Sequence, residues 1–212
     1  MLKSAILQHI SKLANKSNVA SCSDKNVENE SYPNARPSTA QFYLDFCFAL
    51  VSANIPIWKI ENDAFKSFLE KYTGFVVPSE STIRKAYVDK HYHSTLERIR
   101  AVVGDKKIWL SVDESIDCTG RQIANAIIGT MEIDKESNIF LLNCEQLDKT
   151  NSVTIAQFIE SSLCLLWPDG IKFDNILLLV TDAASYMKKT ASSLRILYPN
   201  MIHLHAWFTQ NF

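Results

Sequence analysis

The sequence has little of what marks a secreted, membrane-spanning or strongly basic protein. Its 22 basic and 23 acidic residues nearly cancel, whereas a dedicated nucleic-acid-binding protein usually carries an excess of Lys and Arg. Whole-chain charge therefore does not support such a protein, although it leaves room for a local basic surface. No apolar run approaches the roughly 20 residues of a membrane span. The N-terminus lacks a continuous apolar segment with a small-residue cleavage site, so we expect no signal peptide.

Cysteine is sparse, odd in number and without a Cys-x-x-Cys pair. This usage is typical of reduced, buried thiols in an intracellular protein. The chain also has no Gly-rich phosphate loop and no Gly-x-Ser-x-Gly elbow, so these two motifs give no sign of nucleotide binding or serine hydrolysis. The five cysteines are Cys22, Cys47, Cys118, Cys144 and Cys164.

What is present divides into four segments. Residues 1–18 have the apolar spacing of a helix. Residues 19–40 are rich in Ser, Asn, Asp and Glu and predict a flexible linker, because they cannot bury much apolar surface. Residues 41–105 have helical periodicity, and residues 106–212 have the shorter period of strands interrupted by two helical stretches.

Local signals within residues 41–105 divide this segment into four helices. The first should end at Asn54, because a proline at 56 pushes the residue before it out of the helical region. Gly74 should end the second helix, and Ser79 is a suitable N-cap for the third. The fourth should end at Gly104.

From Lys106 the order of elements predicts a single α/β domain. Three consecutive strands are followed by alternating helix and strand, which gives β-β-β-α-β-α-β and a mixed sheet. This order matches the ribonuclease H-like arrangement. The run 175–181 is apolar throughout, as expected for a strand covered on both faces. The predicted elements are strands 107–117, 121–134, 138–148, 175–181 and about 201–208, and helices 150–166 and about 183–197.

Two aspartates about seventy residues apart are the most informative candidates for chemistry. Asp113 lies in the first predicted strand, and Asp182 directly follows the fourth. Two carboxylates on neighbouring strands are what a two-metal phosphoryl-transfer site needs. Alternation along the strand places Asp113 on the face of Trp109 and Ser111. The alternatives are a solvated strand end for Asp113, beside Glu114, and a helix N-cap for Asp182.

Other polar groups give weaker signals. His203 and His205 should point to one face of the last strand, but no nearby Cys or carboxylate completes a set of zinc ligands. A second pair, His91 and His93, is more typical of solvent-exposed side chains than of a metal site. Basic residues recur in the helical segment and could contact phosphates, although mixed Lys and Glu on helices more often form a solvated face. These basic residues are Lys59, Lys66, Lys71, Arg84, Lys85, Lys90, Arg98 and Arg100.

Four motifs, in this order, resemble hAT-superfamily transposases and, more narrowly, their domesticated relatives around the CGG triplet repeat-binding protein. The helical segment carries the narrower resemblance, and the part from residue 106 resembles the transposase ribonuclease H-like core. The motifs are residues 53–59 (Ala-Asn-Ile-Pro-Ile-Trp-Lys), 78–84 (Pro-Ser-Glu-Ser-Thr-Ile-Arg), 112–117 (Val-Asp-Glu-Ser-Ile-Asp) and 180–187 (Val-Thr-Asp-Ala-Ala-Ser-Tyr-Met).

The resemblance matches Asp113 and Asp182 to the first two catalytic acids of that core, which in the family hold divalent metal, Mg²⁺ or Mn²⁺, for DNA strand cleavage and transfer. The family's third acid, a glutamate after a long helical insertion, would fall beyond Phe212. A Cys-x-x-His that usually follows the last strand is also missing, since Ala206 and Thr209 stand at its positions. The resemblance therefore implies a truncated ribonuclease H-like core.

The N-terminal segment resembles only the tail of a BED-type zinc finger. Residues 3–9 fit the segment around the finger's first histidine, His9, but Ala14 or Asn15 stands where the second would fall, and the paired cysteines upstream are missing. A structural zinc site needs four ligands. We therefore expect a zinc-finger remnant helix at 1–18, with no bound metal and no cofactor.

These expectations give a non-catalytic, transposase-derived nuclear protein. By analogy with the CGG-repeat-binding relatives, it would associate with DNA through Lys59, Arg84 and Lys85 and act in transcriptional regulation, without a membrane role. A protein-interaction module, a homo-oligomer or a vestigial transposon fragment is the alternative, favoured by the neutral charge and by an apolar C-terminal stretch. A third is a residual metal-dependent nuclease that recruits Glu114 or Asp117.

Overall fold

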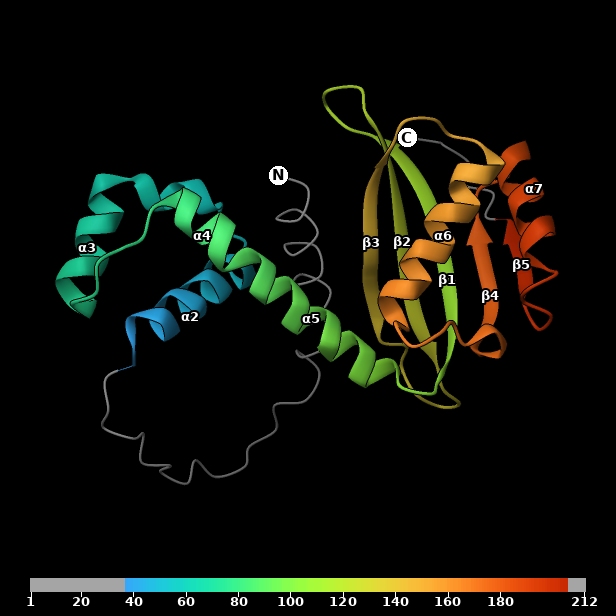
Figure 1. The fold of residues 1–212 in the computed structure, drawn as a ribbon, viewed down its shortest axis with the longest axis horizontal. Coiled ribbons are helices and arrows are strands. Elements are labelled where there is room, and N and C mark those ends of the chain that lie inside the picture. Colours follow the sequence, from blue (N-terminus) through green and yellow to red (C-terminus); the bar gives the residue numbers. More distant parts are fainter. Residues whose placement is uncertain (1–36, 206–212) are drawn as a thin grey trace. The chain divides into compact units, whose positions relative to one another are not determined.

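The computed structural model describes residues 37–205 (Figure 1). The predicted helix at 1–18, most of the predicted linker at 19–40 and the last residues of the predicted strand at about 201–208 lie outside the described residues. The described chain divides into two compact units between Thr95 and Leu96, within one helix. The first unit is helical, and the second is a mixed α/β unit, as the sequence predicts.

The helical unit follows the predicted local signals closely. The side chains of Ser38, Asn62 and Ser79 each accept a hydrogen bond from the backbone at a helix start, which satisfies an N–H group that has no partner within the helix. Gly74 ends its helix in the left-handed conformation at φ 65°, a region that glycine enters without steric cost. The helices are α2 (Thr39–Ser52), η1 (Ile57–Glu61), α3 (Asp63–Thr73), α4 (Glu80–Ala86) and α5 (Val88–Val103).

One apolar core holds the helical unit together. η1 was not predicted: it is a short 3₁₀ segment after the helix-ending proline, and it packs against α2, α3 and α4. Its residues Ile57 and Ile60 are each only 1% exposed, so this connection contributes to the core. The buried cluster contains Phe46, Cys47, Leu50, Val51, Ile57, Ile60, Val77, Ile83 and Val88.

The α/β unit is a five-stranded mixed sheet in the order β3-β2-β1-β4-β5. β1 pairs antiparallel with β2 and parallel with β4, and β5 extends the sheet parallel to β4. With its helices the element order is β-β-β-α-β-α-β, the predicted ribonuclease H-like order (Figure 1). The elements are β1 (Lys107–Ile116), β2 (Gln122–Met131), β3 (Ile139–Leu147), α6 (Ser152–Leu166), η2 (Phe173–Asn175), β4 (Ile176–Thr181), α7 (Ser185–Leu194) and β5 (Ile202–His205).

The two faces of β1 are chemically different, as its alternation predicts. Ile108, Leu110 and Val112 are buried. Their side of the sheet is the one on which α6 packs against β2 and β3, and α6 in turn contacts α7. On the opposite face the indole of Trp109 lies against Gly129 of β2, where an added Cβ would come within 2.2 Å of the ring. Glycine is therefore required opposite this tryptophan, because any side chain would occupy the space of the indole.

One predicted detail of this unit is wrong. β4 is not covered on both faces: Ile176 and Leu179 are buried, but Leu178 and Val180 are partly exposed. Leu177 is also partly exposed, so a continuous apolar run did not mean equal burial along the strand. Among the described residues, no helix is both long and apolar enough to span a membrane.

Candidate functional site

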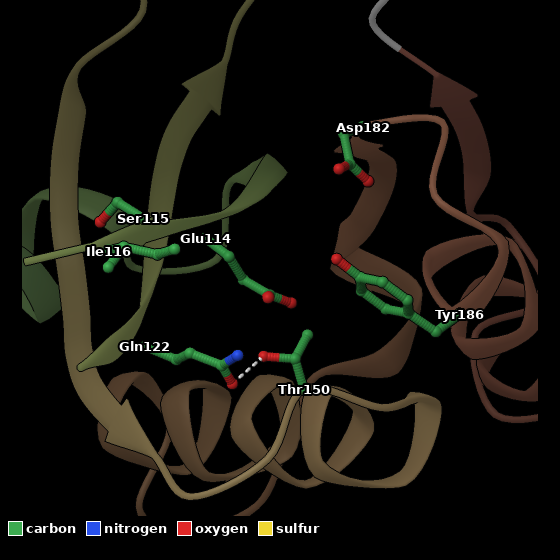
Figure 2. A pocket seen from close by; sticks show the side chains of 7 residues that line it. All are labelled: Glu114, Ser115, Ile116, Gln122, Thr150, Asp182 and Tyr186. Carbon is green, nitrogen blue, oxygen red and sulfur yellow. Dashed lines mark hydrogen bonds between the residues drawn. The ribbon is translucent and has the colours of Figure 1, made fainter. Parts of the chain in front are cut away.

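A pocket of about 410 Å³ opens where β1 and β4 end at the same edge of the sheet (Figure 2). β1 and β4 run parallel, and Ser111 pairs with Val180. Asp113 and Asp182 each follow that pair by two residues, so the topology brings the two predicted acids to one edge. The residues lining the pocket are Glu114, Ser115, Ile116, Gln122, Thr150, Asp182 and Tyr186.

Glu114, rather than Asp113, is the β1 carboxylate in this pocket. It continues the alternation of Leu110 and Val112, and its side chain points between Thr150 and Tyr186 (Figure 2). Its Oε1 atom is buried and accepts no hydrogen bond from the described residues. Burial raises the pKa of Glu114, and the nearby Asp182 and Asp113 carboxylates raise it further. Glu114 therefore binds a proton more readily than an ordinary glutamate.

Polar side chains surround this carboxylate from other elements. The Thr150 hydroxyl, just before α6, donates to Gln122 Oε1 at the start of β2 over 2.5 Å. The Thr150 hydroxyl and the Tyr186 phenol stabilise the ionised form of Glu114 and so partly oppose the rise in its pKa. The pKa of the Tyr186 phenol is raised by burial and then by the negative charges of Glu114, Asp182 and Asp113. Three carboxylates therefore lie close enough to Tyr186 to raise the pKa of its phenol.

Asp182 occupies the pocket edge, but it is not the N-cap of α7. Ala184 holds the cap position, with no side-chain cap bond. Asp182 Oδ1 instead accepts the backbone N–H of Ala184 over 3.1 Å, which makes a local turn between β4 and the helix. The cap prediction is wrong because α7 begins at Ser185, two residues later than expected. The exposed Asp182 carboxylate still faces the pocket (Figure 2).

Asp113 lies near the same edge, but it is exposed and does not line the pocket. It belongs to the face of Trp109 and Ser111, as the alternation predicts. The motif match predicts Asp113 as the acid of this strand, and the sequence offers Glu114 only as a ligand of the alternative, residual nuclease. Alternation places Glu114 in the same set as Leu110 and Val112, but by itself it does not show that this set faces the pocket.

The described residues do not fit a two-metal centre. Among them, no group of three or more His, Cys, Asp or Glu side chains is arranged to hold a metal ion. Hard cations such as Mg²⁺ need several oxygen ligands, many of them carrying negative charge, whereas Glu114 and Asp182 are the two carboxylates that line this pocket in the described chain. This set of ligands is smaller than a two-metal phosphoryl-transfer site needs.

Two further candidate residues, Asp117 and His203, make contacts outside the pocket. Asp117 accepts hydrogen bonds from Thr119 and from the backbone and side chain of Arg121, and these bonds lower its pKa. It holds the turn between β1 and β2 and does not line the pocket. His203 Nε2 lies 2.9 Å from the Thr181 hydroxyl, and burial lowers its pKa. Its ring centre is 4.4 Å from that of His205.

The proposed DNA-contacting side chains lie on two helices that pack together. η1 carries Lys59, whose Nζ is 4.2 Å from the centre of the Trp58 ring. α4 carries Arg84, which pairs with Glu80 over 2.6 Å, and the exposed Lys85. η1 contacts α4, so the fold brings these separate sequence positions into one part of the helical unit.

The whole helical segment has no basic excess. Acidic side chains match the basic ones in number over residues 41–105, so any attraction for phosphate must come from how the charges are distributed. The acidic residues are Asp45, Glu61, Asp63, Glu70, Glu80, Asp89, Glu97 and Asp105.

Comparisons with known proteins give a likeness of fold only. No family model matches the sequence, and no curated protein matches it. A chain of a pre-cleavage Mos1 transpososome is similar at 12% identity and a TM-score of 0.32, over 92% of this chain and 66% of that chain. An Argonaute of Marinitoga piezophila, solved with a 5′ OH guide RNA, is similar at 11% identity and a TM-score of 0.26, over 59% and 22%. The chain thus spans 66% and 22% of these two proteins.

Proposed function

We propose that this chain is a hAT-type, transposase-derived protein of the nucleus that associates with DNA through its helical unit and acts in transcriptional regulation. The observation that carries the proposal is the packing of η1, which carries Lys59 and the exposed ring of Trp58, against α4, which carries Arg84 and Lys85. The motifs of the CGG-repeat-binding relatives include two of these cations, Lys59 and Arg84, and support the same assignment.

The charge pattern around these residues suits reversible phosphate contacts. Lys59 and Lys85 have no carboxylate within ion-pair distance in the described part of the chain. Arg84 pairs with Glu80, but both side chains are about one-third exposed, at 34% and 30%. Partly exposed pairs of this kind contribute little to stability, so Arg84 can exchange a carboxylate for a phosphate oxygen at small cost.

Binding of labelled duplex DNA tests this proposal. We expect fluorescence anisotropy to detect binding that weakens as salt increases, because released counterions drive phosphate contacts. A preference for CGG-rich over scrambled duplex would narrow the assignment to the CGG-binding type. Changing Lys59, Arg84 and Lys85 together to Glu should abolish binding, and circular dichroism should show an unchanged helix content.

The matched control reverses three exposed cations of the α/β unit, Lys188, Lys189 and Arg195. It changes the net charge equally and should leave binding close to that of the unchanged chain. Equal losses in both triple variants would contradict a helical-unit site. No binding to either duplex would instead favour a protein-interaction module, for which the edge strand β5 offers Ile202 and Leu204 at 62% and 50% exposure.

The second part of the proposal is that the acidic pocket does not cleave DNA. A residual nuclease is the competing function, and Glu114 beside Asp182 in one pocket is the observation that favours it. The purified chain is incubated with supercoiled plasmid and Mg²⁺ or Mn²⁺. We expect no nicking above the level of the Asp182→Asn and Asp113→Asn variants. Metal-dependent nicking that either variant removes would establish the nuclease.

A further inference from the structure

Lysine ammonium groups lie over aromatic rings at three places in the helical unit. The separations from Nζ to ring centre are 4.2 Å for Lys59 and Trp58, and 5.2 Å for Lys71 and Tyr72. The third pair, Lys90 with Tyr87, is also 5.2 Å apart, but Tyr87 is partly buried. Trp58 and Tyr72 are 54% and 69% exposed. Two large rings are therefore open to solvent, each with a cation beside it.

The chain holds these two rings on elements that pack together. η1 contacts α3, and Asn62 ends η1 and also caps α3 by accepting the Phe65 N–H over 3.0 Å. Along α3, Phe68 lies one turn before Tyr72, and their ring centres are 5.0 Å apart. Phe68 is itself 57% exposed. The short connection at Asn62 thus joins the helix that carries Trp58 directly to the helix that carries Phe68 and Tyr72.

Carboxylates near these rings make contacts that do not involve the two lysines. Glu61 Oε1 accepts the backbone N–H of Glu80 over 2.7 Å, and Glu70 Oε1 accepts that of Val77 over 3.0 Å. Within the described chain, Lys59 and Lys71 form no ion pair with a carboxylate. Each ammonium is therefore available to an incoming anion.

We infer that Trp58 and Tyr72, with Lys59 and Lys71, form a stacking surface for unpaired nucleotides of single-stranded DNA. An exposed π face binds a base only where that base is not already stacked and paired, and the neighbouring ammonium can contact the phosphate that follows it. A purely apolar peptide would be a poor partner, because its binding would take two ammonium groups out of water without a counter-charge. This inference deepens the proposed DNA association, because it names the form of DNA that the helical unit prefers.

The test compares one labelled oligonucleotide as a single strand and as a duplex, with the full-length chain. We expect tighter binding to the single strand. Trp58→Ala and Tyr72→Ala should each weaken single-strand binding by roughly tenfold, the size expected when one stacking ring is removed, and should change duplex binding little. Trp58→Phe and Tyr72→Phe keep an aromatic ring and should restore most of the affinity.

Phe48→Ala is the matched control. Phe48 is an exposed ring of the same unit, at 47%, but its aromatic neighbour is His91 and not a lysine. Its removal should leave single-strand binding unchanged. Tryptophan fluorescence gives an independent readout, because stacking on Trp58 should quench emission in the unchanged chain, and this quenching should be lost in Trp58→Phe although binding persists.

The outcomes separate this inference from the proposed function. Duplex binding without a single-strand preference, and without an effect of the two alanine variants, would overturn the stacking surface and leave the proposed DNA association intact. An equal loss with Phe48→Ala would also overturn it, since any exposed ring would then matter. No binding to either form of DNA would overturn both.

Discussion

Glu114 lies in an environment that disfavours its ionised form. Its Oε1 atom is buried without a hydrogen-bond partner among the described residues. Transfer of a carboxylate from water into such a site is unfavourable unless a partner compensates for lost hydration. The neighbouring Asp182 and Asp113 charges add repulsion and raise its pKa further. The ionised form of Glu114 therefore lowers the stability of the folded α/β unit at neutral pH.

This environment predicts how stability depends on pH. The pKa of Glu114 is raised above its ordinary value of 4.5 in the folded chain. The folded state thus retains a proton that the unfolded state has already released, and its stability falls as pH rises from 4.5 through the raised pKa. Glu114→Gln removes this loss. Urea unfolding should show the variant to be more stable than the unchanged chain at pH 7, with a difference that shrinks as pH falls below 4.5.

The control for this experiment is Glu136→Gln, at an exposed position outside the pocket. It removes one carboxyl group without changing the pocket. If Glu136→Gln shows the same dependence on pH, the effect does not come from the pocket. If Glu114→Gln is less stable at pH 7 than the unchanged chain, the carboxylate of Glu114 stabilises the fold. Either result contradicts this prediction.

The same residue shows what the sequence could and could not predict about the site. The sequence predicted Asp113 within one strand and Asp182 directly after a neighbouring one, and β1 does pair with β4 in the sheet. Which carboxylate faces the pocket depends on which face of β1 the helices cover. Alternation divides the strand into two sets but does not say which set forms the pocket, so the choice between Asp113 and Glu114 needed the structure.

At the scale of elements, local chemistry predicted the boundaries best where one residue decides them. Ser79 caps α4 and Gly74 ends α3 as expected, because a side-chain oxygen or a left-handed φ satisfies the helix end directly. The start of α7 was wrong because Asp182 suits both a cap and a turn. η1 was missed because a 3₁₀ segment of five residues is too short to show a periodic pattern.

The burial of an element was harder to predict, because it depends on tertiary packing. The run that became β4 looks fully buried in sequence, yet Leu177, Leu178 and Val180 remain partly exposed. Apolar character shows that a residue tolerates burial, whereas burial itself depends on which elements cover each face of the sheet.

For the whole molecule, the division into units falls earlier than the change in periodicity. The sequence placed the start of the α/β domain at residue 106, where the spacing of apolar residues changes. The compact unit begins at Leu96, within α5. Arg100 donates from Nε and from one terminal nitrogen to the Leu165 carbonyl at the end of α6, over 2.9 Å and 2.7 Å. The second half of α5 is helical in sequence, but it packs with the elements of the α/β unit.

This arrangement predicts that the α/β unit needs α5. A fragment of residues 88–205 keeps the whole helix, whereas a fragment of residues 106–205 begins where the sequence period changes. The shorter fragment loses Ile99 and Val103, which are 2% and 0% exposed, together with the two bonds of Arg100. Burial of one aliphatic side chain contributes about 1.5–3 kcal/mol, so the shorter fragment should be less stable by about 3 kcal/mol or more.

Urea unfolding followed by circular dichroism measures this difference. Arg100→Ala in the longer fragment is a matched variant, which removes the bonds to Leu165 and keeps the apolar contacts. It should lie between the two fragments in stability, because the buried side chains contribute more than the hydrogen bonds. Equal stability of both fragments would place the boundary at residue 106, and α5 would then belong to the helical unit alone.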